Sequence, residues 1–185
     1  VSEFMLQQTQ VATVIPYFDR FMRRFPTVQS LARARIDSVL PCWAGLGYYR
    51  RCHHLHAAAK AILREHDGSV PHDVESLRSL PGVGLYTAGA VASIAFGVRA
   101  PAVDGNVRRV LARVIGSPHL GTSAAQSGSA WDGLVTLAER LVPAKRPGDF
   151  NQALMELGAT TCSPRKPQCG SCPVRRLCGF GAVLD

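Results

Sequence analysis

The sequence of 185 residues has no long uninterrupted hydrophobic segment. Its longest stretch without a charged residue is Ser79 to Val98, and Pro81, Gly82 and Gly84 interrupt the beginning of that stretch. About 14 residues of possible helix remain, whereas a membrane-spanning helix needs about 20. The sequence therefore predicts no membrane span, and it shows no secretory signal.

Runs of alternating β-branched residues are also missing, and nearly every segment has apolar residues at helical spacing instead. Phe18, Phe21, Met22 and Phe25 illustrate this pattern as one apolar stripe. We therefore expect an all-α fold. The predicted helices cover 2–15, ending or kinking near Pro16, and then 17–25, 28–34, 36–44, 48–65, 74–80, 85–96, 105–115, 130–141 and 150–160, with 117–129 as a linker.

Acidic residues and lysine are both scarce. The chain has 13 acidic and 21 basic residues, a net charge of +8 and a pI near 9.6, and its only lysines are Lys60, Lys145 and Lys166. The other basic residues are arginines, which suit bidentate phosphate contacts. A polyanion such as nucleic acid is the first partner to consider, although charge alone fits a basic soluble surface equally well.

Cysteines are few, but four of the six lie in the last 24 residues, as Cys162-x6-Cys169-x2-Cys172-x5-Cys178. Such a cluster usually holds metal, because a chain of this length can bury a core without disulfides and nothing indicates secretion. Spacing alone leaves a zinc ion and a four-iron cluster equally plausible.

The other two cysteines, Cys42 and Cys52, lie in helical context and are predicted to be small apolar residues. The tract from Cys52 to His56 contains three histidines, but neighbours on a helix point in different directions. His53 and His54 therefore fit a phosphate-facing or solvated stretch better than a metal site.

The segment Leu80-Pro81-Gly82-Val83-Gly84 joins two predicted helices, 74–80 and 85–96, as helix, hairpin, helix. Glycines let the backbone approach a phosphate closely, and amides at a following helix N-terminus bind anions without reading bases. The sequence therefore suggests a DNA backbone contact here, although Pro-Gly turns are also common structural joints.

Two carboxylates occur in distinctive settings. Glu3 is followed by Gln7 and Gln10 at helical spacing, so the three residues form one polar stripe. This stripe is either a solvated helix face or a face that contacts DNA bases, since glutamine can contact base edges. Asp104 stands where the N-cap of the helix 105–115 is expected.

With these motifs in view, the sequence resembles adenine DNA glycosylases of the helix-hairpin-helix superfamily. The resemblance covers nearly the whole chain and rests on five motifs in order: 1–11, the Gly45–Tyr49 loop, the Leu80–Gly84 hairpin, Val103–Val107 and the four cysteines. It implies hydrolytic removal of adenine mispaired with 8-oxoguanine or guanine, after the base is flipped out of the duplex. It also implies that the four cysteines hold a [4Fe-4S] cluster.

The resemblance assigns roles to individual residues. Glu3 would be the general acid that protonates the adenine ring, and Asp104 would stabilise or trap the oxocarbenium-like sugar. Tyr86 and Asn106 match positions that support Glu3 and Asp104, and Leu6 and Gln152 match positions that line the adenine pocket. Gln8 and Tyr48 match residues that are inserted into the DNA duplex. The hairpin residues Gly82, Val83 and Gly84 would contact the DNA backbone. We further expect Arg165 and Lys166 to contact phosphates.

Two other functions share part of this pattern. An endonuclease III-like glycosylase/lyase shares the hairpin, aspartate and cluster, but it uses a hairpin lysine as nucleophile where this chain has Tyr86. A catalytically silent iron-sulfur DNA-binding module would need neither Glu3 nor Asp104. A monofunctional glycosylase is therefore the favoured interpretation.

The expected architecture has two helical lobes flanking a DNA-binding cleft. Residues 16–116 form a six-helix barrel-like lobe with the helix-hairpin-helix at 74–96, and 1–15 with 117–185 form the cluster lobe, whose cysteine loop covers 162–178. We expect a monomer acting on double-stranded DNA in the cytoplasm, at a bacterial-type nucleoid. Because a helical pattern is already present at Val1, we expect sequence upstream, and we expect the family's C-terminal domain to be absent.

Overall fold

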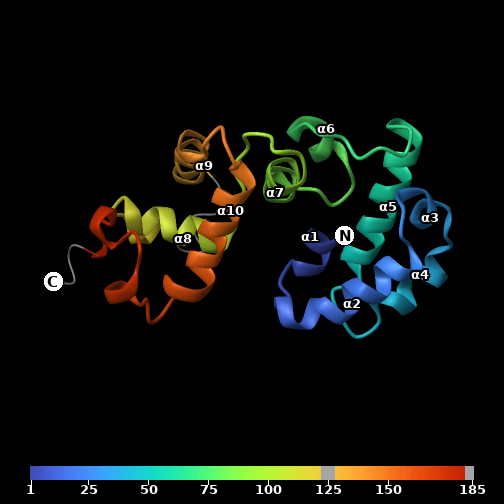
Figure 1. The fold of residues 1–185 in the computed structure, drawn as a ribbon, viewed down its shortest axis with the longest axis horizontal. Helices are drawn as coiled ribbons and strands as arrows, with labels where there is room; N and C mark the ends of the chain where they lie inside the picture. The colour runs from blue at the N-terminus through green and yellow to red at the C-terminus, as the bar shows by residue number, and fades with distance from the viewer. Residues whose placement is uncertain (122–127, 182–185) are drawn as a thin grey trace. The chain divides into compact units, whose positions relative to one another are not determined.

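The computed structural model describes residues 1–121 and 128–181, and those residues form helices and loops with no strand (Figure 1). The all-α prediction is confirmed. The elements are α1 (Ser2–Leu6), α2 (Val11–Arg24), α3 (Val28–Arg33), α4 (Ile36–Trp43), α5 (Arg50–Glu65), α6 (Val74–Ser79), α7 (Leu85–Phe96), α8 (Gly105–Val114), η1 (Pro118–Gly121), α9 (Ser129–Leu141), α10 (Pro147–Glu156), the π-helical turn η3 (Leu157–Thr161), η4 (Cys169–Ser171) and η5 (Arg175–Leu177). None of the helices in the described residues is long and apolar enough to cross a membrane.

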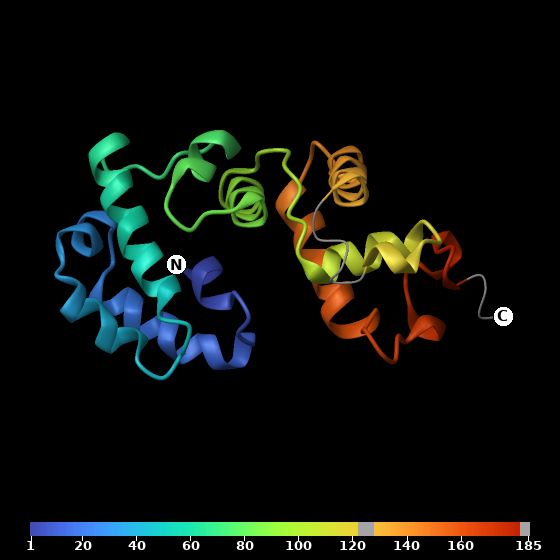
Figure 2. The same cartoon turned by 180° about the vertical axis from the view of Figure 1, so that it is seen from behind.

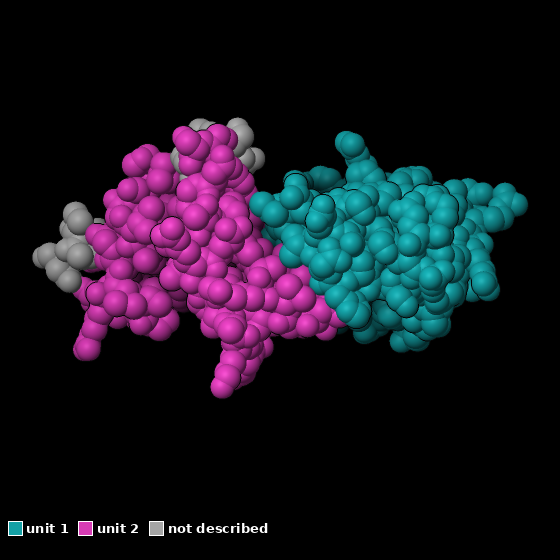
Figure 3. All heavy atoms as spheres, turned by 90° about the horizontal axis from the view of Figure 1, so that it is seen from above, with its two compact units in different colours: residues 1–88 teal, residues 89–185 magenta. Residues whose placement is uncertain are grey.

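The chain divides into two compact units, Val1–Ala88 and Gly89–Asp185, which Figure 3 distinguishes by colour. Helix α7 begins in the first unit and continues into the second. The expected lobes over 16–116 and over 1–15 with 117–185 have different boundaries and stay a prediction.

The first unit is built around aromatic side chains of α2 and α4. Helix α5 packs against α3 and α4, and α2 packs against α1 and α4, as both ribbon views show (Figures 1 and 2). Phe21 and Trp43 are fully buried, with their rings edge to face at a centroid distance of 6.2 Å. Phe25 is also buried, next to Phe21. The aromatic stripe expected from the sequence therefore faces the core.

The prediction of one helix over 2–15 is wrong. Helix α1 ends at Leu6, and α2 begins at Val11 and continues through Pro16 to Arg24. The chain leaves the helical path at Gln7, whose ψ is 113°, and Gln8 then adopts a left-handed conformation with φ of 57°. Pro16 removes one backbone hydrogen bond without ending α2, since buried Val14 and Phe21 hold the helix on both sides of it.

The second unit has its core on one face of α8. Val107, Leu111 and Ala112 of α8 are buried with Leu134 and Ala138 of α9. Helix α10 and η3 also pack against α8. This arrangement holds the beginning of α8, where Asp104 lies, against the segment that leads into the cysteine loop.

Two predicted boundaries in the second unit need correction. The last long helix begins at Pro147, not at residue 150, and its α-helical part ends at Glu156, where the π-helical η3 follows. Pro147 suits this start, because its fixed φ and missing N–H are tolerated in the first turn of a helix. At Gly148 a Cβ atom would lie 2.7 Å from the Ile94 Cα, so that only glycine allows this contact. Of the predicted linker 117–129, residues 118–121 form η1, and 122–127 lie outside the described residues.

Candidate active site

Glu3 lies on α1, a helix of five residues held by its apolar side chains. Phe4 and Met5 are buried, which anchors α1 and leaves Glu3 half-buried on another face. The Tyr86 hydroxyl, on the second residue of α7, donates a hydrogen bond of 3.1 Å to the Glu3 Oε2 atom. The structure thus brings together two predicted catalytic residues that are 83 positions apart in the sequence. Leu6, the last residue of α1, is also half-buried.

The hairpin between α6 and α7 depends on a glycine with positive φ. Gly82 has φ of 76°, and a Cβ atom there would lie 2.4 Å from the Cβ atom of His54. The Val83 amide closes the turn on the Leu80 carbonyl at 3.1 Å. At Gly84, by contrast, a Cβ atom would meet nothing within 4 Å, so the backbone there is open. A helix-hairpin-helix is therefore present where the sequence predicted it.

A groove in the first unit, with a volume of about 820 Å³, collects most of the predicted DNA-binding residues. Gln8, Tyr48, Gly82, Val83 and Gly84 all line it, as sequence reasoning expected. Two arginines that the sequence analysis did not assign, Arg50 and Arg78, line it as well. His54, predicted to lie in a phosphate-facing or solvated stretch, also lines it, on the face of α5 shared with Arg50. The i, i+4 spacing of Arg50 and His54 is the signal that could have found them.

Gln8 and Tyr48 both project from strained backbone. Their φ angles are 57° and 46°, in the left-handed region that residues with a side chain rarely adopt. The Tyr48 side chain is 61% exposed, so it is available to a ligand in the groove. Strain of this kind persists only where the surrounding structure imposes it.

Asp104 caps α8 in the second unit. Its Oδ1 atom accepts a hydrogen bond of 2.7 Å from the Val107 amide, so the predicted N-cap is confirmed. Its Oδ2 atom accepts a hydrogen bond of 3.1 Å from the Asn106 side chain. Asn106 is fixed by close packing, because a Cβ atom on Gly158 would lie 2.7 Å from its own Cβ. The predicted supporting role of Asn106 thus has a geometric basis.

Arg109 connects Asn106 with the beginning of the cysteine loop. Its guanidinium donates to Asn106 Oδ1 at 2.9 Å, to the Gly158 carbonyl at 2.7 Å and to the Cys162 carbonyl at 2.9 Å. Burial lowers the pKa of Arg109 from its ordinary value, but an arginine remains charged at neutral pH. Sequence reasoning did not single out Arg109, although it follows Asn106 at i+3 on α8.

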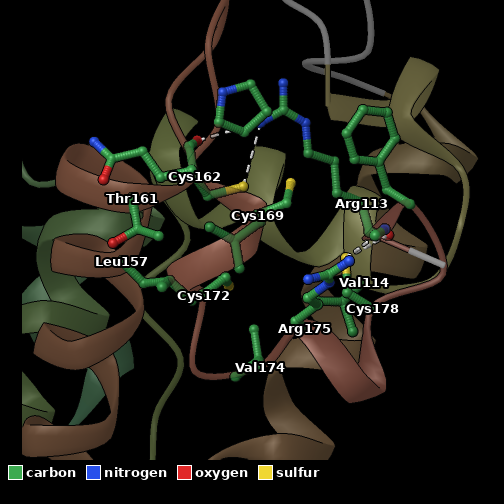
Figure 4. A pocket seen from close by; sticks show the side chains of 15 residues that line it. Arg113, Val114, Leu157, Thr161, Cys162, Cys169, Cys172, Val174, Arg175 and Cys178 are labelled. Carbon is green, nitrogen blue, oxygen red and sulfur yellow. Dashed lines mark hydrogen bonds between the residues drawn. The ribbon is translucent and has the colours of Figure 1, made fainter. Parts of the chain in front are cut away.

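The four clustered cysteines line one cavity in the second unit (Figure 4). All are partly buried, and none forms a disulfide. Two of the sulfur atoms accept hydrogen bonds: Cys162 from Arg113 Nη1 at 3.3 Å, and Cys178 from the Gly181 amide at 3.4 Å. Soft thiolates with N–H donors suit an iron-sulfur cluster or zinc. In the part of the chain that is described, no three His, Cys, Asp or Glu side chains converge closely enough for a single ion.

Three further predicted residues lie on the surface of the second unit. Arg165 and Lys166 are exposed in the loop between the first two cysteines. Gln152 is exposed on α10, and its side-chain amide donates to the Gly148 carbonyl at 3.2 Å. The phosphate contacts of Arg165 and Lys166 and the place of Gln152 in the adenine pocket stay predictions. The pairing of Glu3, in the first unit, with Asp104, in the second, also stays a prediction.

These features define a helix-hairpin-helix protein that has Glu3 in its first unit, and Asp104 and a cysteine-lined cavity in its second unit. The comparison with known families agrees with that class. Residues 1–126 match the family described as "HhH-GPD superfamily base excision DNA repair protein", and the chain belongs to this family.

Individual proteins that the chain resembles are DNA glycosylases and an endonuclease III. The chain is 54% identical over 179 residues to an adenine DNA glycosylase of Rattus norvegicus, covering 96% of this chain and 34% of the relative. It matches a thermostable thymine-DNA glycosylase structure with a TM-score of 0.85 and 31% identity, over 98% of this chain and 82% of the other. An endonuclease III–DNA complex matches with a TM-score of 0.79 and 26% identity, over 98% and 81%. The chain spans about a third of the length of the mammalian relatives it matches.

Proposed function

We propose that this protein is an adenine-specific DNA glycosylase of base excision repair, which hydrolyses the bond between adenine and deoxyribose after the base is extruded from the duplex. The observation that carries the proposal is the Glu3 carboxyl group, bound by Tyr86 directly after the helix-hairpin-helix turn. The identity of 54% to an adenine DNA glycosylase supports the choice of base.

The groove of the first unit supports binding of double-stranded DNA. Exposed amides and glycines of the hairpin contact the phosphate backbone without reading sequence. Tyr48 and Gln8 fill the space that the extruded nucleotide leaves, since both side chains project into the same groove. Leu6, half-buried at the end of α1, and Gln152, exposed on α10 of the other unit, are the proposed contacts of the extruded adenine.

Glu3 and Asp104 divide the chemistry between them. Adenine is a poor leaving group as an anion, so protonated Glu3 donates its proton to a ring nitrogen as the glycosidic C–N bond breaks. The electron pair of that bond leaves with the base, and the sugar becomes an oxocarbenium-like cation. Ionised Asp104 stabilises this cation or forms a transient ester with it. Water then adds to the anomeric carbon, which frees the Asp104 carboxylate from any ester, and the proton that water loses restores the acid form of Glu3.

A monofunctional hydrolase is favoured over a lyase. A Schiff-base mechanism needs an amine nucleophile at the sugar. The described lining of the groove contains no lysine, and Tyr86 occupies the position after the hairpin. Lys60, Lys145 and Lys166 are all exposed elsewhere.

The base opposite the adenine is proposed to be 8-oxoguanine or guanine. The protein is proposed to act as a monomer.

The cysteine loop is proposed to hold a [4Fe-4S] cluster on Cys162, Cys169, Cys172 and Cys178. A zinc ion draws four sulfur atoms to about 2.3 Å from one point. A four-iron cluster binds one thiolate at each iron, so it fits sulfurs that line a cavity without converging on a point. When bound, the cluster would fix the loop that presents Arg165 and Lys166.

Metal analysis of protein purified without air tests this assignment. We expect about four irons and four sulfides per chain and a brown colour, since each thiolate binds one iron. Cys162→Ser should lower the iron content, whereas Cys42→Ser, which changes a cysteine outside the loop, should leave it unchanged. A colourless protein with one zinc per chain would contradict the cluster.

Single-turnover release of adenine from a duplex with adenine opposite 8-oxoguanine tests the enzyme assignment. Glu3→Gln keeps the size of the side chain but cannot donate an acid proton, so we expect a rate at least about 100-fold lower with DNA affinity retained. Glu75→Gln changes an exposed carboxylate on α6 of the same unit and should leave the rate unchanged. An unchanged rate in Glu3→Gln would refute the general-acid role.

A further inference from the structure

Arg51, the second residue of α5, is a buried cation surrounded by backbone. It is 6% exposed. Its Nη1 atom donates to the carbonyls of Phe4 at 3.2 Å, Met5 at 2.6 Å and Gln7 at 2.5 Å. Its Nη2 atom donates to the carbonyls of Leu46 at 3.5 Å and Gly47 at 3.3 Å. One guanidinium thus binds two segments that are far apart in the sequence.

The two bound segments end at the two residues with strained backbone that face the groove. The Gln7 carbonyl immediately precedes Gln8, and the Gly47 carbonyl immediately precedes Tyr48. Both following residues have positive φ. A left-handed conformation is unfavourable for a residue with a side chain, so nearby contacts must stabilise it. Arg51 supplies such contacts to both residues at once.

Stacking fixes the guanidinium against the same loop. The Cζ atom of Arg51 lies 5.2 Å from the centre of the Tyr48 ring and 5.5 Å from the centre of the Trp43 ring. The Trp43 indole also donates to the Gly47 carbonyl at 3.0 Å. The position of the Tyr48 ring therefore depends on Arg51 through both its backbone and its π face.

Arg51 has no exposed N–H group left for a DNA phosphate. Nη1 and Nη2 carry four hydrogens and face five carbonyls. The Nε atom is buried without a hydrogen-bond partner in the described residues. The neighbouring Arg50 and Arg78 line the same groove but are exposed, so they are the side chains suited to phosphates.

We propose that Arg51 is a positioning residue that holds Gln8 and Tyr48 as one preformed wedge for base extrusion, and that it does so without contacting the DNA. The inference rests on the proposed function, because that function is what makes Gln8 and Tyr48 a wedge for base extrusion. Arg51 would affect base extrusion by holding the backbone of these two inserted residues.

Base extrusion is measured by the fluorescence of 2-aminopurine placed at the target position, opposite 8-oxoguanine, which rises when the base leaves the stack. Arg51→Lys keeps the charge but cannot form the planar fork of hydrogen bonds. We expect the extrusion equilibrium and the single-turnover rate to fall by about 10- to 100-fold, since small displacements of positioned groups have effects of this size. The slope of log Kd against log salt should stay unchanged.

Arg50→Gln is the matched control, because Arg50 is the adjacent arginine in the same groove. Because Arg50 is exposed and suited to a phosphate, Arg50→Gln should reduce the salt slope by about one. Arg51→Gln removes the charge, and its slope should stay unchanged if Arg51 does not contact the DNA. A slope lowered by about one in Arg51→Gln would overturn the proposal, since it would make Arg51 a phosphate contact.

A double-mutant cycle separates positioning from general stability. In a variant with Gln8→Gly and Tyr48→Gly the backbone can keep its left-handed conformation, but the wedge side chains are gone. Adding Arg51→Lys to this variant should lower extrusion no further, whereas an additive loss would overturn the proposal. If the unmodified protein extrudes the base but releases no adenine from its natural substrate, the proposed function fails and the role of Arg51 still stands.

Discussion

At the residue scale, Asp104 has one observed role, as the cap of α8, and one proposed role, as the charge that stabilises a cationic sugar. One carboxylate oxygen caps α8 through the Val107 amide, and the other accepts a hydrogen bond from Asn106. Capping needs only an acceptor oxygen, whereas stabilising a cationic sugar needs a negative charge. Substitutions that keep the oxygen and remove the charge therefore distinguish the two roles.

Asp104→Ser keeps a good N-cap and removes the charge. We expect its free energy of unfolding to fall by less than about 1 kcal/mol and its rate of adenine release to fall at least about 100-fold. Asp73→Ser is the matched control, since Asp73 caps α6 through the Ser76 amide at 2.8 Å. It should show the same small loss of stability and a normal rate. Equal rates in the two variants would reduce Asp104 to a cap.

At the scale of elements, the hairpin between α6 and α7 owes its shape to Gly82. Its positive φ and the close approach of His54 both require a residue without a side chain. Gly84, two positions later, has ordinary φ and open space around it. The two glycines of the motif therefore serve different purposes: Gly82 forms the turn, and Gly84 leaves room for a ligand.

Gly82→Ala should reduce the free energy of unfolding by about 2 kcal/mol, because alanine is strained at this φ and its methyl group would overlap His54. Gly84→Ala should change the free energy of unfolding by less than about 0.5 kcal/mol. It should instead weaken DNA binding, since a methyl group would intrude where a phosphate approaches. Urea denaturation and a binding titration check both variants. Equal destabilisation by the two substitutions would contradict the distinction.

At the scale of the whole molecule, the net charge of +8 gives the protein a long-range attraction for DNA, and the exposed cysteine loop contributes part of it. Arg165 and Lys166 are both exposed, and arginine and lysine at phosphates release counterions from DNA on binding.

Replacing Arg165 and Lys166 together by Gln should reduce the slope of log Kd against log salt by up to about two. The control variant Lys60→Gln with Arg64→Gln removes the same charge from exposed positions of α5 outside the groove. It should change the slope by much less. A slope that responds equally to both pairs would mean that the cysteine loop acts only through net charge.

Local patterns were sufficient for most helices of this protein. Helix α7 covers the predicted residues, and Asp104 caps α8 as expected, because apolar periodicity and capping chemistry act within a few residues. The same reasoning failed between Leu6 and Val11. There the carbonyls at the end of α1 bind Arg51 and not the next turn of helix. No property of residues 1–15 alone could have indicated that partner.

The sequence by itself determined the helical class, the hairpin, the cysteine cluster and the resemblance that pointed to Glu3 and Asp104, because each of these depends on residue types at short spacing. Only the tertiary structure decided which distant groups meet: Tyr86 with Glu3, Arg109 with Gly158 and Cys162, and Arg51 with the backbone before Gln8. The physical reason is that these contacts join residues far apart in the chain. Their partners are chosen by burial and by hydrogen bonds that buried carbonyls must form, which local spacing does not record.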